Sequence, residues 1–413
     1  MLLLIFIYFL NLLFFLIIMK RDFMSFERPY KGLKVVDFSQ GVAGPYCAML
    51  LAQHGAEVIK VEPKDGDWAR NLGQEYGDHS AFSVTANLGK KSFVIDLKNP
   101  KSQSILDKII AEADIFIEGF RPGVIERLGY SYERLKQYNP KLIYLSISGF
   151  GQIGPMSKKP AMDPVLQAFT GFMSENKGPD GCPHRTPVII FDMTTALYAM
   201  QLIASTLYAR INEDVGRKIE ISLMEAAAAM QSIRLMSGYM DGPYTHASSP
   251  SGTFKTKDGW IQIIVVKNHE FIKFCDAIGW KDFVNDERFS SNSKRRGHEK
   301  LLTEEVQKLF INNTTDYWKK LLTKAEVQNE KVQSYSEFIT SDQTKVLEII
   351  SWLKQPTSDQ IWPIPNLPGM PKLVNGSYLS IAPSLGQHTR NIMLDYGYKK
   401  DDVDKLIKEG VII

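Results

Sequence analysis

The sequence predicts an α/β protein whose larger part is a doubly wound, Rossmann-like domain. Through the first 150 residues, short runs rich in branched apolar side chains alternate with segments of helical periodicity. The first strand–helix–strand unit is complete within about 30 residues, and such a unit requires a parallel sheet with a right-handed crossover. The composition shifts after about residue 240, which predicts a second, smaller α+β domain.

The first unit comprises strand 33–39, a loop, a helix that ends near Gly55, and strand 57–62. Pro45 suits the first turn of this helix, where its missing N–H costs nothing. The alternation continues with strands at 93–97, 114–118, 142–147 and 217–223, and with helices at 101–112, 131–138, 163–173, 193–211 and 224–238.

The C-terminal part predicts strand 260–266 and helices near 268–278, 296–311, 315–325, 387–396 and 401–409. The stretch 355–371 contains five prolines and predicts an extended linker, because proline lacks the N–H that helices and central strands need. We therefore expect three parts: an apolar segment at 1–23, a large domain of residues 24–235 rejoined by 375–413, and a small domain with its linkers at 236–374.

The composition excludes several classes of protein. Hydrophobic residues make up 44% of the chain and charged residues 23%, which is too apolar for a disordered protein. The net charge is only +3, whereas a dedicated nucleic-acid-binding protein carries a basic surplus. The cysteines (Cys47, Cys182 and Cys275) lie far apart, which argues against a disulfide framework or a zinc site and favours a reducing cytoplasm.

The extreme N-terminus is almost wholly apolar. Residues 1–19 contain one polar side chain, Asn11, and are long enough to span a bilayer as a helix. Lys20 and Arg21 follow, and this positive flank would keep the rest of the chain cytoplasmic. The sequence allows two interpretations: residues 1–19 are a membrane anchor, or translation starts at Met24. The expected location is the cytoplasm, with membrane attachment only if the anchor is real.

The loop Gly41–Pro45 is the first candidate binding site. It lies between a strand and the start of a helix, where backbone N–H groups favour an anion. Glu62 ends the next strand, where dinucleotide-binding proteins place a ribose-binding acid. The glycine spacing does not match G-x-G-x-x-G, so we expect an unspecified ligand at the carboxyl edge of the sheet and keep nicotinamide as the weaker alternative.

Basic residues follow several of the predicted strands. The carboxyl ends of parallel strands share one edge of a sheet, so these side chains could converge on a polyphosphate. The alternative is an ordinary solvated surface. The residues are Lys60, Lys64, Lys90, Lys91, Lys98, Arg121 and Arg127.

Asp192 follows the apolar run 187–191 and precedes a long helix, so we expect a helix N-cap. A carboxylate at that position is stabilised in its ionised form, which suits a nucleophile. Asp163, before Pro164, is a second expected N-cap. His184 lies in a loop and is expected to be exposed, and no spacing of histidines and acids indicates a metal site.

Several segments together resemble the family III CoA-transferases, also called the CaiB/BaiF family, which includes formyl-CoA transferase and carnitine CoA-transferase. The similar stretches are 33–45, 54–62, 87–92, 96–98, 114–123, 127–129, 139–140, 147–151 and 154–155, with weaker matches at 254–259 and 385–389. The motifs occur in the right order from about Met24 to the end of the chain.

This resemblance implies a transfer of CoA from an acyl-CoA to a carboxylic acid, without a metal. Asp192 attacks the thioester to form a mixed anhydride, and the CoA thiolate returns to give an aspartyl-CoA thioester, which the acceptor carboxylate attacks. The implied CoA contacts are Val42, Ala43, Lys64, Ile95, Asp96, Leu97, Lys98, Gly119, Phe120 and Arg127. Lys64 is included because Pro63 stands where some members carry an arginine.

The resemblance also implies an interlocked homodimer, and it leaves two other functions open. The α-methylacyl-CoA racemases have the same fold but place a histidine before the residue that matches Asp163; here Met162 stands there and cannot move a proton. A non-catalytic acyl-CoA-binding homologue, anchored by residues 1–19, is the second alternative. The segment 248–253 contains only Gly252 where some members have a glycine-rich loop over the active site, so the acceptor-binding residues are not carried over.

Overall fold

The computed structural model describes residues 28–178, 180–242 and 246–413. The chain divides into two compact units, one formed by the residues up to Leu235 together with Glu348–Ile413, and the other by Met236–Leu347. The expected apolar segment 1–19 and the alternative start at Met24 lie outside the described residues. Within the described ranges, no helix is both long enough and apolar enough to cross a bilayer.

The large unit is built on one sheet of six parallel strands, and this confirms the predicted doubly wound α/β fold. The strands are β1 (Lys34–Asp37), β2 (Glu57–Glu62), β3 (Lys91–Val94), β4 (Ile115–Glu118), β5 (Ile143–Ser148) and β6 (Lys218–Ser222). Their spatial order is β3-β2-β1-β4-β5-β6. The strand order reverses between β1 and β4, and ligands of such sheets bind outside the carboxyl ends of the strands at this point.

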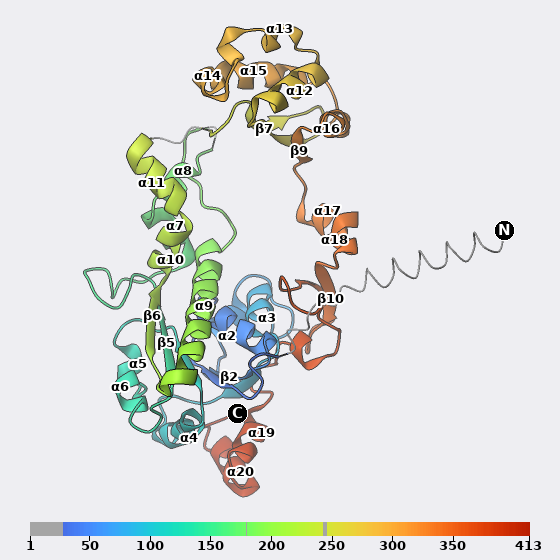
Figure 1. The fold of residues 1–413 in the computed structure, drawn as a ribbon. Helices are drawn as coiled ribbons and strands as arrows, with labels where there is room; N and C mark the ends of the chain where they lie inside the picture. Colours follow the sequence, from blue (N-terminus) through green and yellow to red (C-terminus); the bar gives the residue numbers. More distant parts are fainter. Residues whose placement is uncertain (1–27, 179, 243–245) are drawn as a thin grey trace, which may run out of the picture. The chain divides into compact units, whose positions relative to one another are not determined.

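Helices pack on both faces of the sheet, as Figure 1 shows for α2 (Ala43–Gln53), α9 (Ile190–Glu213) and α4 (Pro100–Ala111). The apolar residues of β1 explain why, because Val35 packs in the same core cluster as α2 and α9, and Val36 packs in the cluster of α4. Successive side chains of a strand point to opposite faces, so a central strand must be apolar on both.

The remaining elements of the large unit are shorter. They are η1 (Trp68–Asn71), α3 (Ala81–Asn87), α5 (Val124–Arg127), α6 (Tyr132–Leu135), α7 (Asp163–Phe169), α8 (Phe172–Glu175), α10 (Leu223–Met230), η3 (Tyr378–Ser380), α19 (Thr389–Asp395) and α20 (Lys400–Lys408), with α11 (Ser232–Asp241) at the boundary between the units. The predicted helix 224–238 is therefore two helices, α10 and α11.

The expectation of an extended linker at 355–371 is wrong in part. Residues 350–365 form an antiparallel hairpin of β10 (Ile350–Lys354) and β11 (Ile361–Pro365). Pro363 and Pro365 both lie in β11, opposite Trp352 and Ile350. A two-stranded hairpin leaves one edge of each strand unpaired, so it accepts prolines that a central strand would exclude.

The second unit consists of a small antiparallel sheet covered by helices. Its strands are β7 (Ser251–Lys255), β8 (Trp260–Ile264) and β9 (Gln328–Lys331), of which only β8 was predicted. Its helices are α12 (Asn268–Ile278), α13 (Lys281–Val284), η2 (Glu287–Phe289), α14 (Asn292–Gly297), α15 (Glu299–Phe310), α16 (Thr315–Lys324), α17 (Tyr335–Thr340) and α18 (Asp342–Val346). Phe274, Phe310 and Trp318 are buried in its separate core.

Candidate active site

A cavity of about 430 Å³ lies at the predicted position, at the carboxyl ends of β1, β4 and β5. All of its lining residues belong to the large unit, and it lies where the strand order reverses. Its lining is Gln40, Val42, Ala43, Gly44, Trp68, Gly119, Phe120, Arg121, Pro122, Ile147, Ser148, Gly149, Ser157, Lys159, Ala161, Met162, Asp192 and Leu223. The cavity therefore brings Asp192 together with four of the residues expected to contact CoA: Val42, Ala43, Gly119 and Phe120.

The loop after β1 presents the start of a helix to this cavity. Helix α2 begins at Ala43, and its N-cap residue, Val42, provides no side-chain cap for the first N–H groups. Gly41 has a φ of +83°, and a Cβ there would lie 2.2 Å from the Trp68 ring, so only glycine fits. The uncapped N–H groups of the first turn can therefore hydrogen-bond an anionic or carbonyl oxygen in the cavity.

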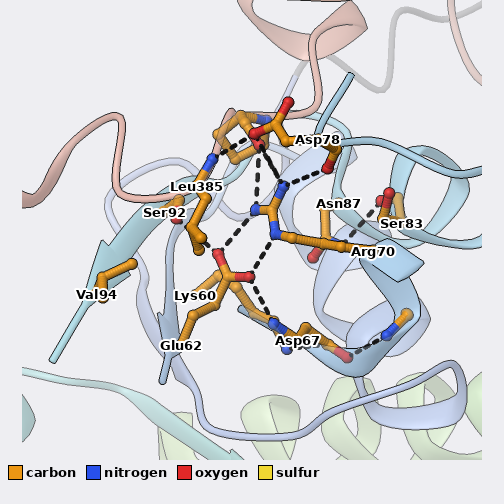
Figure 2. Close-up of polar contacts among 12 residues, drawn as sticks. Lys60, Glu62, Asp67, Arg70, Asp78, Ser83, Asn87, Ser92, Val94 and Leu385 are labelled. Atoms are coloured by element: carbon orange, nitrogen blue, oxygen red, sulfur yellow. Dashed lines mark hydrogen bonds and ion pairs between the residues drawn. The ribbon is translucent and has the colours of Figure 1, made fainter. Parts of the chain in front are cut away.

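Two buried charged residues, Lys60 and Asp67, hold this loop, and Figure 2 shows them. The Gly41 N–H donates to Asp67 Oδ1 at 2.9 Å, and Lys60 Nζ donates to the Ser39 carbonyl and pairs with Asp67 Oδ2 at 2.8 Å. Lys60 is fully buried, which contradicts both the solvated surface and the polyphosphate-binding rim considered for it. It is buried because it lies within a central parallel strand, whose two faces are both covered.

Glu62 and Lys90 also have structural partners. Arg70 holds Glu62 with two hydrogen bonds, at 2.7 and 2.9 Å, so Glu62 is not aimed at a ribose (Figure 2). Burial alone would raise the pKa of Glu62. The hydrogen bonds and the charge of Arg70 outweigh this effect, so the pKa of Glu62 lies below its usual value. Lys90 is fully buried and donates to Asp37 Oδ2 at 2.8 Å; its burial lowers its pKa to about 8.

Asp192 is half-buried in the first turn of α9, three residues beyond the N-cap position that was expected for it. The helix begins at Ile190 with Ile189 as its N-cap, so the expected N-cap role of Asp192 is wrong. Asp163 is not the N-cap of its own helix either, since Met162 occupies that position before α7.

The buried Asp163 carboxylate caps α9 from the neighbouring helix. Its Oδ2 accepts from the N–H of Phe191 at 2.6 Å and from the N–H of Asp192 at 3.2 Å. Its Oδ1 accepts from Gln167 Nε2 at 2.6 Å. The first N–H groups of α9 are thus used by Asp163, and they are not available to stabilise the side chain of Asp192.

The pKa of Asp192 is raised to about 7, first by burial of its carboxyl and second by the charge of Asp163. This direction is opposite to the expected stabilisation of the ionised form by the helix N-terminus. The main reason is that the Asp192 carboxyl is removed from water. In addition, the helix N–H groups bind the Asp163 carboxylate, whose negative charge raises the pKa of Asp192 further. Near neutral pH, Asp192 is present in both its protonated and its ionised form.

The other residues expected to contact CoA lie outside this cavity. They are Lys64, Ile95, Asp96, Leu97, Lys98 and Arg127. Ile95 is fully buried beside Ile412, whereas Lys64 Nζ and Asp96 Oδ2 form a partly exposed ion pair at 3.4 Å. For residues 95–98 the cause is topological, because they follow β3, which is an edge strand that β2 and β1 separate from β4.

Sequence patterns did not indicate several residues of the cavity. The predicted site did not include Gln40, Trp68, Ser157 or Lys159. Trp68 lies outside the motif segments, although it packs tightly against Gly41. Ser157 and Lys159 lie in an irregular loop, where no periodicity marks the buried side. Arg121, one of the scattered basic residues, does line the cavity. Among the described residues, no three His, Cys, Asp or Glu side chains gather as a metal ion would require.

Comparisons with known proteins identify a family and agree with the fold. The family described as CoA-transferase family III matches residues 30–389. An acetyl-CoA:oxalate CoA-transferase of Acetobacter aceti is 34% identical over 72% of this chain and 79% of its own, and a succinyl-CoA:glutarate CoA-transferase of Mus musculus is 29% identical over 93% and 90%. The crystal structure of a CaiB/BaiF family protein from Brucella suis superimposes with a TM-score of 0.77 at 28% identity, covering 90% of this chain and 100% of the other.

Proposed function

Since the chain belongs to CoA-transferase family III, we propose that it moves CoA from an acyl-CoA thioester to a carboxylic acid through covalent intermediates on Asp192. The observation that carries this proposal is the position of the Asp192 carboxyl, which shares one cavity with the uncapped start of α2. A carboxylate is the required nucleophile, because its anhydride with an acyl group keeps the reactivity of a thioester.

The first half of the reaction uses the donor. An Asp192 oxygen attacks the thioester carbonyl, the C–S bond breaks, and the CoA thiolate leaves behind a mixed anhydride. The thiolate then attacks the aspartyl carbonyl of the anhydride, and the donor acid departs as a carboxylate. Asp192 now carries CoA as a thioester. No water enters and no electron is gained or lost.

The second half repeats these steps with the acceptor. The acceptor carboxylate attacks the aspartyl thioester and releases the thiolate, which forms a second mixed anhydride. The thiolate then attacks the carbonyl that came from the acceptor. The new acyl-CoA leaves, and the Asp192 carboxylate is regenerated.

The surrounding groups have two roles in this proposal. The N–H groups at the start of α2, at Ala43 and Gly44, stabilise the oxyanion that forms at each attack. Gly119 and Phe120, together with Arg121, form another part of the cavity lining. We keep Lys64, Ile95, Asp96, Leu97, Lys98 and Arg127 as proposed contacts for the nucleotide end of CoA.

Family membership supports further parts of the proposal. We propose an interlocked homodimer, as in related proteins, which sedimentation would test. The acceptor class is a carboxylic acid; the names of the two relatives above contain oxalate and glutarate, which are both dicarboxylates. Cys47, Cys182 and Cys275 are all free thiols, which agrees with the proposed cytoplasmic location.

Trapping of the covalent intermediate tests this function. The protein is incubated with an acyl-CoA and then treated with hydroxylamine or borohydride, and the modified peptide is identified by mass spectrometry. We expect an aspartyl hydroxamate, or the reduced side chain, at Asp192. Exchange of the α-proton of the acyl group without an adduct would instead support a racemase. CoA binding with neither result would support a non-catalytic binding protein.

A further inference from the structure

A second cavity, of about 540 Å³, adjoins the one that contains Asp192. Its walls come from α7 and α8 and from two basic residues of the flanking loops. The lining consists of Lys159, Pro164, Val165, Ala168, Phe169, Met173 and Arg185. Lys159 lines both cavities, and Met162 of the first cavity is only two residues from Pro164 of the second. A molecule that reacts at Asp192 could therefore extend past Lys159 into this space.

The second cavity combines apolar walls with positive charge that has no counter-charge. Of its lining residues, Val165 and Phe169 are large apolar side chains left exposed. Lys159 Nζ lies 5.7 Å from the centre of the Phe150 ring, and within the described residues no carboxylate pairs with Lys159 or with Arg185. An apolar cavity with unpaired cations fits an anion that carries a short hydrocarbon chain.

The acidic residues near this stretch of the chain are already occupied. The Glu175 carboxylate accepts from Arg234 at 2.7 Å, and the Asp163 carboxylate is buried and directed at the start of α9. The exposed Asp180 carboxylate accepts from the Cys182 N–H at 3.0 Å and lies 3.8 Å from His184 Nε2. None of these three acids pairs with Arg185, so a ligand carboxylate can bind its guanidinium group. The guanidinium group can hold a carboxylate with two parallel hydrogen bonds, which a hydrocarbon end cannot replace.

From this juxtaposition we infer that the second cavity is a subsite for the far carboxylate of a dicarboxylic acid. One carboxylate of the acid reacts at Asp192, the short chain lies against Val165 and Phe169, and Arg185 and Lys159 bind the other carboxylate. The inference rests on the proposed function and narrows its acceptor to acids with a second negative charge. Arg185 is then a specificity-determining residue that takes no part in the bond changes.

The test compares two acceptors with five carbons, glutarate and pentanoate, which differ in the second carboxylate. The measured quantity is the ratio of their kcat/KM values. We expect the wild-type protein to prefer glutarate, and Arg185→Gln to lower the ratio at least about 10-fold, chiefly through a higher KM for glutarate, because one charge-assisted interaction is lost. Arg185→Lys should restore part of the preference.

Two exposed lysines provide matched controls. Lys158 and Lys177 lie beside the subsite in the sequence but line neither cavity. Lys158→Met and Lys177→Gln should leave the ratio unchanged, whereas Lys159→Met should lower it. If all of these variants lowered the ratio by the same factor, the cause would be a general loss of positive charge. That result would contradict a defined subsite.

Failure of the inference can be separated from failure of the proposed function. If both acids are converted equally well, or if Arg185→Gln keeps the preference, the subsite is wrong while the transferase stands. If no acceptor is converted and no adduct forms at Asp192, the function is wrong. Calorimetric titration with glutarate then tests the subsite by itself. Binding to the wild type that is lost in Arg185→Gln supports the subsite. No binding to the wild type, or equal binding to both proteins, overturns it.

Discussion

Two acidic sites of the large unit have opposite surroundings. Near the loop after β1, the Glu62 carboxylate accepts two hydrogen bonds from the guanidinium group of Arg70, and the pKa of Glu62 lies below its usual value (Figure 2). At the start of α9, Asp192 meets the carboxylate of Asp163, and its pKa is raised to about 7. The first region thus stabilises the ionised form of its carboxyl group, whereas the second destabilises it.

The difference separates the part of the molecule that holds the fold from the part that reacts. A buried acid paired with a cation stays ionised and is a poor nucleophile, since its electrons are shared with hydrogen-bond donors. An acid kept near a like charge and out of water is more basic and more nucleophilic, and such groups cluster at functional sites.

Asp192→Asn should cause the largest change. An amide cannot form the anhydride, so we expect transfer to fall at least about 1,000-fold. Asp180→Asn, at an exposed carboxyl before the same helix, should keep the wild-type rate. Steady-state assays of acyl-CoA formation give both values, and an Asp192→Asn variant with unchanged transfer would remove the distinction between the two regions.

Arg70→Met should have the largest effect on stability. It leaves Glu62 buried without its cation, and removal of one partner of such a pair costs about 3–5 kcal/mol. Urea unfolding measures this loss. The double variant Glu62→Gln with Arg70→Met should lose less than Arg70→Met alone, because no unpaired charge remains. Equal losses in both variants would mean that the pair is not what stabilises this region.

Asp163→Asn should move the pH dependence of the rate. The reaction needs ionised Asp192, so the rate should fall as the pH drops through about 7. Removing the negative charge beside it lowers the pKa of Asp192, and the acidic limb of the profile should shift to lower pH. The asparagine oxygen can still accept from the Phe191 N–H, which keeps the start of α9 in place. An unshifted limb would contradict the coupling.

The stability of the two regions should respond to pH in opposite directions. Folded Asp192 has a raised pKa, so between its ordinary value of 3.8 and about 7 it binds a proton that the unfolded chain has released, and stability falls as the pH rises. Glu62 has a lowered pKa and contributes stability that is lost only as the pH falls. At pH 8, Asp192→Asn should therefore be more stable than the wild type by about 1–3 kcal/mol, with a smaller difference at pH 4.

The sequence predicts some features of the two regions and not others. The sheet follows from apolar runs that strands buried on both faces require, and Asp192 stands out because it ends such a run before a long helix. The burial of Lys60 and Lys90 could not be read from the sequence, since a lysine in a strand looks the same whether it reaches water or a buried aspartate.

The role of Asp163 could not be predicted either. Its bond to the N–H of Phe191 joins residues that are 28 positions apart, and no local spacing encodes it. The same holds for Trp68, which reaches the cavity only because Gly41 has no side chain. Local patterns give strands and helix starts, whereas contacts between loops depend on how the elements pack.

The transfer of an oxygen atom from the acceptor acid to the Asp192 carboxyl tests the covalent mechanism most directly. The protein is loaded with an acyl-CoA and then given an acceptor acid labelled with ¹⁸O in its carboxylate for a single turnover. The mechanism predicts that one labelled oxygen remains in the Asp192 carboxyl, because the thiolate attacks the acceptor carbonyl and leaves the bridging oxygen on the aspartate. Formation of labelled acyl-CoA with no ¹⁸O in the peptide that contains Asp192 would contradict it.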